Sequence, residues 1–166
     1  MAVMLAAFGL SAAVPWAATG PKRQVVTLVV TGNYKSPRLM AELIQNESRQ
    51  PYLLLPAAES DDTRIYYCPP KSNSIEIRED KLNDFVRYIN PRRILVLGDS
   101  SYVQTKYLDQ FDRTIPLVQV YSVDWNRTAD EVSDMLALTN LSTDYKRLRE
   151  NLLNKGSIYR PISAPV

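Results

Sequence analysis

Short apolar runs alternate with amphipathic stretches along most of this chain. An unbroken apolar run suits a strand that is covered on both faces, and helical spacing of apolar positions indicates a helix with one buried side. The runs predict strands at about residues 24–30, 51–55, 64–68, 94–97 and 115–121, with a further short extended segment at 74–78. The helical spacing predicts helices at 36–47, 79–89 and 102–111. It predicts two more, one capped by Thr128 or Asn126 and one capped by Ser142 or Thr143.

Strands and helices therefore alternate, which is typical of an α/β protein with a parallel sheet. We predict a three-layer sandwich around a mainly parallel, flavodoxin/Rossmann-like sheet of about five strands. It forms one domain over residues 21–156, because no linker divides the chain. Residues 157–166 contain two prolines and no apolar period, so they predict a loose tail.

Residues 1–20 are apolar and small and carry no charged side chain. The stretch has the length of a signal-peptide core and is short for a membrane span. Small-x-small cleavage patterns occur at residues 11–13 and 18–20. We predict a signal peptide, a periplasmic or cell-surface location, and no stable membrane span after processing. The alternatives are an uncleaved anchor or a buried N-terminal helix.

Composition excludes several kinds of chemistry. The net charge of the 166 residues is only +2, and no basic run is interleaved with aromatic residues, so we expect no nucleic-acid partner. The chain has no histidine, which removes Ser-His-Asp and Cys-His catalysis and imidazole-based zinc sites. Its one cysteine, Cys68, is interpreted as a small structural residue. Neither a Walker A pattern nor a dinucleotide fingerprint is present, and we expect no cofactor.

Three polar loops, at residues 32–38, 98–101 and 124–127, each follow a predicted strand and precede a helix. Ligands of open α/β sheets bind at such carboxyl ends, and helix N-termini favour anions. Lysine and arginine side chains would add charge-assisted bonds. The candidate ligand-binding residues are Gly32, Asn33, Lys35, Ser36, Arg38, Gly98, Asp99, Ser100, Ser101, Asp124, Trp125 and Arg127. The alternative is that Ser36, Ser100 and Thr128 only cap helices and that the basic residues are ordinary solvated ones.

The tetrapeptide Asp124-Trp125-Asn126-Arg127 is the most unusual part of these loops. A tryptophan between charged residues at a strand end is suited to stacking on a sugar ring. The alternative is a tryptophan that closes the sheet edge while Asp124 and Arg127 pair.

The same loops carry a family resemblance over residues 25–137. VVTGNYKSPRLMAELI and then QPYLLLP are followed by RILVLGDSSYV and VYSVDWNRTADEV. This order is similar to that of the type 2 cell-wall-binding repeat of bacterial surface proteins, with Asp99 where a second glycine is usual and Asp124, Arg127, Thr128 and Ala129 kept. The resemblance implies a non-catalytic module that docks on an anionic envelope polymer.

The favoured interpretation is an exported, non-catalytic binding module for an anionic cell-envelope polymer or glycan, with no catalytic residue and no metal. One alternative is a hydrolase of a phosphate or sugar ester that uses Asp99, Ser100 and Asp124, with Mg²⁺ held by the two carboxylates. Another is a structural component of an envelope complex. The oligomeric state and the ligand's identity stay open.

Overall fold

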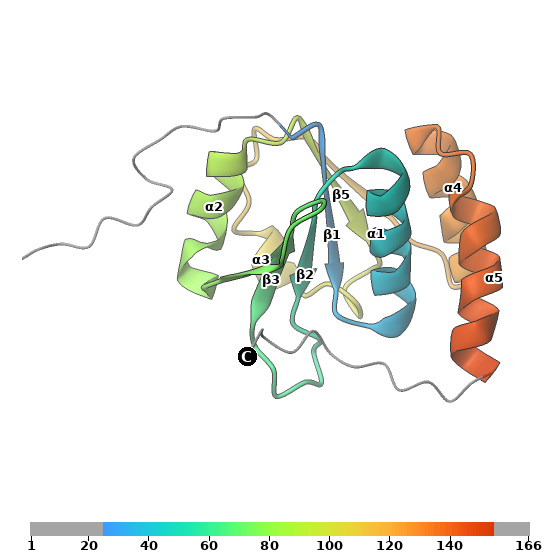
Figure 1. Cartoon of the computed structure of the whole chain (residues 1–166). Coiled ribbons are helices and arrows are strands. Elements are labelled where there is room, and N and C mark those ends of the chain that lie inside the picture. Colours follow the sequence, from blue (N-terminus) through green and yellow to red (C-terminus); the bar gives the residue numbers. More distant parts are fainter. Residues whose placement is uncertain (1–24, 155–166) are drawn as a thin grey trace, which may run out of the picture.

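The computed structural model describes residues 25–154 (Figure 1). The predicted signal peptide and the predicted C-terminal tail lie outside the described residues. Within residues 25–154, no helix combines the length and the apolarity needed to cross a membrane.

The structure is an α/β fold built on one six-stranded sheet, in the order β4-β3-β2-β1-β5-β6. The four strands β2, β1, β5 and β6 are parallel neighbours, whereas β3 pairs antiparallel with both β2 and β4. The strands are β1 (Thr27–Gly32), β2 (Tyr52–Leu55), β3 (Ile65–Cys68), β4 (Ile75–Ile77), β5 (Arg93–Leu97) and β6 (Leu117–Val120).

The predicted count of about five strands is corrected to six, because the short segment around residue 76 pairs with β3. Two of the three residues of β4 are exposed and only Ile77 is buried. A strand this short and this exposed leaves a weak apolar pattern, since it lies at the edge of the sheet.

Helices cover both faces of the sheet. Alternate residues of a strand point to opposite faces, so Val29 joins one apolar core and Leu28 the other. Helices α1, α4 and α5 pack in the first core, and α2 with the segment around α3 packs in the second (Figure 1). The helices are α1 (Lys35–Ser48), α2 (Leu82–Ile89) after a short 3₁₀ turn η1 (Glu79–Lys81), α3 (Thr105–Leu108), α4 (Trp125–Leu136) and α5 (Leu141–Asn154).

The helix predicted over residues 102–111 is much shorter in the structure. The backbone N–H groups of Tyr102 and Val103 both donate to the Asp99 carbonyl and form a turn, and α3 begins only at Thr105. The spacing predicted Val103, Tyr107 and Leu108 on one side of that helix; Val103 and Tyr107 are buried, and Leu108 is half-buried. The spacing was therefore informative about burial but not about the number of helical turns.

Two predicted helix starts are also corrected. Tyr34 is the N-cap residue of α1 and Ser36 lies inside the helix, with no side-chain cap. Helix α4 starts at Trp125, because the Asp124 carboxylate accepts the N–H of Asn126 at 2.9 Å and caps it. Thr128 instead binds the N–H of Ser122 through its hydroxyl at 3.0 Å.

The turns after β1 and β5 meet at the same edge of the sheet, as the parallel arrangement predicted. Strand β1 pairs in register with β5 from Thr27 opposite Arg93 to Thr31 opposite Leu97. A Cβ added to Gly32 would collide with the backbone carbonyl of Tyr102. Gly98 has a φ of 109°, which L side chains rarely adopt, and the Tyr102 side chain lies over it.

We expect Gly32→Ala to lower the free energy of unfolding by about 3 kcal/mol, because the new methyl group meets backbone rather than a flexible side chain. Urea unfolding followed by circular dichroism measures the change. A variant as stable as the wild type would show that the turn after β5 does not press on the end of β1.

Ala137→Gly, by contrast, is expected to raise the free energy of unfolding. Ala137 ends α4 with a φ of 53°, a left-handed conformation that costs a residue with a Cβ about 1 kcal/mol or more. Glycine removes that cost, so the midpoint of thermal unfolding should rise by a few degrees. Calorimetry of the full chain tests this, and a lower midpoint would contradict it.

Candidate functional site

The candidate site lies along the carboxyl-end rim, which we define as the end of the sheet at which the parallel strands β1, β5 and β6 finish. Because these strands are parallel, the three loops that the sequence singled out leave from the same edge. The loop after β5 is also tied to β6, because the Gln119 side chain donates to the Gly98 carbonyl at 2.7 Å.

Four aromatic side chains join the three loops and form what we call the aromatic cluster: Tyr34, Tyr102, Tyr121 and Trp125. Tyr102 is at its centre, with ring centroids 5.3 Å from Tyr34, 5.0 Å from Trp125 and 5.9 Å from Tyr121. Most of these pairs are edge-to-face, the arrangement that the ring quadrupoles favour. The cluster closes the rim over β1 and holds the loops in place.

Trp125 belongs to the interior of this cluster. It is 3% exposed, and its indole N–H donates to the Tyr102 hydroxyl at 3.2 Å. Of the two interpretations of Trp125, stacking on a sugar ring is not supported, because its ring is buried. Trp125 closes the sheet edge, but the pair predicted beside it does not form. Arg127 pairs with Glu131 at 3.1 Å, and Asp124 lies 3.9 Å from Arg149.

The two candidate carboxylates both hold backbone turns. Asp99 accepts the N–H of Ser101 at 2.9 Å, and Asp124 caps α4. Burial raises the pKa of both Tyr121 and Tyr145. The charge of Asp99 adds to the shift of Tyr121, and the charge of Asp124 adds to that of Tyr145, so the two carboxylates lie near different tyrosines. Among the described residues, no group of three or more acidic or cysteine side chains is placed to hold a metal ion.

The basic candidates differ in accessibility. Arg38 is 6% exposed, bonds Glu42 at 2.9 Å and reaches the Asn33 side-chain oxygen at 3.4 Å. Its guanidinium is thus engaged inside the protein, which does not favour a role as a ligand contact. Lys35 and Arg127 are exposed, and Ser36 lies beside Tyr145.

An open depression lies on the rim between the ends of β5 and β6. This rim depression has a volume of about 520 Å³. Its polar lining comes from Asp99, Ser100, Thr105 and Gln119, and its apolar lining from Tyr121, Val103 and Leu108. Of the twelve candidate residues, the depression brings together only Asp99 and Ser100. Gly32 and Gly98 are buried against Tyr102 and face no open space.

Sequence reasoning missed Gln119 and Tyr121. Gln119 is the one polar residue inside the apolar run 115–121, and that isolated amide was a signal that could have identified it. Tyr121 carries no such signal, because a tyrosine at a strand end is as common in a core as in a binding site. Its 37% exposure is known only from the fold.

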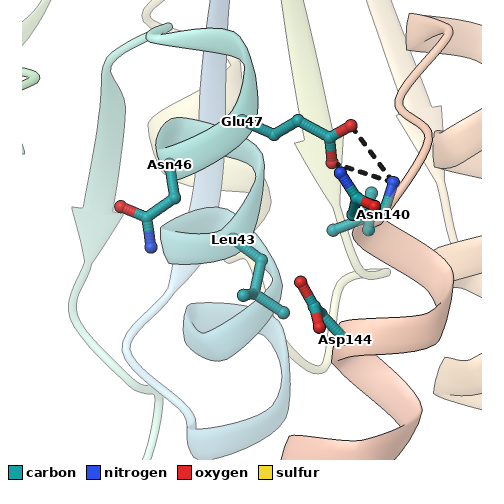
Figure 2. A pocket seen from close by; sticks show the side chains of 6 residues that line it. Leu43, Asn46, Glu47, Asn140 and Asp144 are labelled. Atoms are coloured by element: carbon teal, nitrogen blue, oxygen red, sulfur yellow. Dashed lines mark hydrogen bonds between the residues drawn. The ribbon is translucent and has the colours of Figure 1, made fainter.

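A second, smaller cavity of about 240 Å³ lies between α1 and α5 (Figure 2). Figure 2 shows the Glu47 carboxylate next to the start of α5, where it accepts the N–H of Asn140 at 3.1 Å. It also accepts the N–H of Thr139 at 2.6 Å. Glu47 thus satisfies backbone donors in front of α5 and connects residues 92 positions apart. This arrangement stabilises the helix pair and explains the cavity's acidic wall.

In comparisons with known proteins, no family model, no curated protein and no solved structure matches this chain. The fold and the rim therefore define the class: an α/β protein with a mostly parallel six-stranded sheet and a depression at the strand carboxyl ends.

Two ionisable side chains, Tyr145 and Cys68, are buried in the core. Burial raises the pKa of Tyr145 to about 12, with Ser36 and Arg149 acting in the opposite direction. Burial also raises the pKa of the Cys68 thiol to about 11, which makes it unreactive at neutral pH. A folded-state pKa above the unfolded one means that stability is present at lower pH and is lost as the pH rises.

We expect the free energy of unfolding to fall between pH 10 and 12, the interval over which Tyr145 ionises first in the unfolded chain and only later in the folded one. Tyr145→Phe should reduce this fall by up to about 2–3 kcal/mol. Urea unfolding at a series of alkaline pH values measures it. Equal slopes for the variant and the wild type would contradict the burial of this hydroxyl.

Proposed function

We propose that this chain is a non-catalytic binding module for a glycan of the cell envelope, acting in the periplasm or at the cell surface after export. The observation that carries the proposal is the rim depression, in which the exposed ring of Tyr121 lies beside the amide of Gln119 and the hydroxyl of Ser100. Sugars present C–H faces to aromatic rings and hydroxyls to amides and carboxylates, so this lining has the chemistry of a sugar site.

Of the two ligands that the sequence left open, a neutral or weakly charged glycan fits the rim better than a polyanion. Asp99 lines the depression and would repel negative charge. Arg38 and Arg127 each bond a glutamate of their own helix, at 2.9 and 3.1 Å, so binding a polyanion would compete with those pairs.

The resemblance to the type 2 cell-wall-binding repeat supports the non-catalytic binding role, whereas the anionic polymer that it implies is the ligand that the rim fits less well. The stretches that carry it correspond to β1, α1 and β2, then to β5 and its turn, and finally to β6 and α4. We also propose that the fold is a three-layer, flavodoxin/Rossmann-like variant. Helices on both faces and the parallel order β2-β1-β5-β6 support this proposal.

The expected result is that the purified chain co-sediments with insoluble cell-wall polysaccharide and that Tyr121→Ala binds about tenfold more weakly, because the stacking face is lost. Val123→Ala is the matched control. Val123 is 89% exposed on the same loop, but it does not line the depression.

Equal binding by the two variants would place the ligand elsewhere, and no sedimentation of the wild type would refute the proposed function. A parallel screen with phosphate and sugar esters addresses the hydrolase alternative. Turnover that is lost in Asp99→Asn, with polysaccharide binding retained, would replace the binding module by an enzyme.

A further inference from the structure

Strand β6 forms one edge of the sheet and exposes apolar side chains there. Leu117 is 41% exposed and Val118 is 39% exposed. Neighbouring residues of a strand point to opposite faces, so both sides of this edge carry accessible apolar surface. Val123, three residues beyond the end of the strand, is also exposed.

The outer side of β6 also presents free hydrogen-bonding capacity. Pro116 and Val120 direct their carbonyls at β5, where they accept the N–H groups of Ile94 and Gly98 at 2.8 and 3.0 Å. In a parallel pair the intervening residues point the other way, so Leu117, Gln119 and Tyr121 direct their backbone groups outward. Within residues 25–154, no strand pairs with that side of β6.

Edge strands of soluble proteins are protected by charged side chains, prolines or coverage. The opposite edge of this sheet follows the rule, because β4 carries Glu76 and is followed by the Arg78–Asp80 ion pair. The sequence of β6, Leu-Val-Gln-Val, has no charge. The edge strand without a charged side chain is therefore the one that exposes Leu117 and Val118.

We propose that β6 pairs antiparallel with β6 of a second copy of this chain, about a two-fold axis at Gln119. The outward backbone groups fit this register, since Gln119 faces its own equivalent and Leu117 faces the partner's Tyr121. An aliphatic residue opposite an aromatic one is a favourable cross-strand pair. Two copies would then share a continuous sheet.

The charged residues at the two ends of β6 favour antiparallel over parallel pairing of the two strands. The exposed Arg113 precedes β6, whereas Asp99 and Asp124 lie at its carboxyl end. Antiparallel pairing brings Arg113 of each copy toward the partner's Asp124. Parallel pairing would place like charges side by side, which is unfavourable.

The contact is short, so a concentration-dependent dimer is expected in sedimentation velocity of the full chain. Gln119→Lys places two like charges opposite each other at the axis and should weaken association by about tenfold or more. Ile75→Lys is the matched control, because Ile75 is 49% exposed on the other edge strand; this variant should dimerise as the wild type does.

A second experiment tests the register without depending on the folding of the lysine variant. In an antiparallel hydrogen-bonded pair the Cα atoms are about 5.5 Å apart, within the range of a disulfide. Gln119→Cys should therefore form a covalent dimer on mild oxidation, and Ile75→Cys should not. The one native cysteine, Cys68, is buried and leaves the assay clean.

A chain that stays monomeric at every concentration would overturn the proposal, and so would a dimer that persists in Gln119→Lys or equal cross-linking of the two cysteine variants. Association is measured without polysaccharide, so these results do not depend on the proposed glycan function.

Discussion

The contact on which the rim depends is the approach of Tyr102 to two glycines. Its backbone carbonyl lies over Gly32 and its side chain over Gly98, at the ends of the adjacent central strands β1 and β5. A side chain at either glycine would push the turn away from the sheet. Because the Tyr102 ring also meets Tyr34, Tyr121 and Trp125, this single contact sets the positions of the loops after β1, β5 and β6.

This contact also explains where the open space lies. In open α/β sheets the ligand crevice forms where the strand order reverses, which here is between the ends of β1 and β5. Tyr102 and Trp125 fill that place with buried aromatic surface. The depression therefore lies one strand further along, between β5 and β6, and its lining comes from the later half of the chain.

Features that depend on the local pattern of residues could be predicted from the sequence, whereas features that depend on contacts between distant residues could not. The apolar runs of β1, β2 and β5 identified buried strands, because central strands must be apolar on both faces. The three polar loops were correctly assigned to one edge, since that follows from parallel alignment. Their side chains were assigned less well. Arg38 and Trp125 have the composition of ligand contacts, yet they are buried by partners that local sequence does not reveal.

Sequence alone determined the alternation of strands and helices, the absence of histidine chemistry and the position of the loops at strand ends, because periodicity and composition are local properties. Tertiary structure decided which polar residues stay accessible, which edge of the sheet is unprotected, and where the depression lies. The physical reason is that burial depends on what packs opposite a residue. Gln119 and Glu47 show this. Gln119 bonds a loop residue 21 positions away, and Glu47 binds a backbone N–H group 92 positions away.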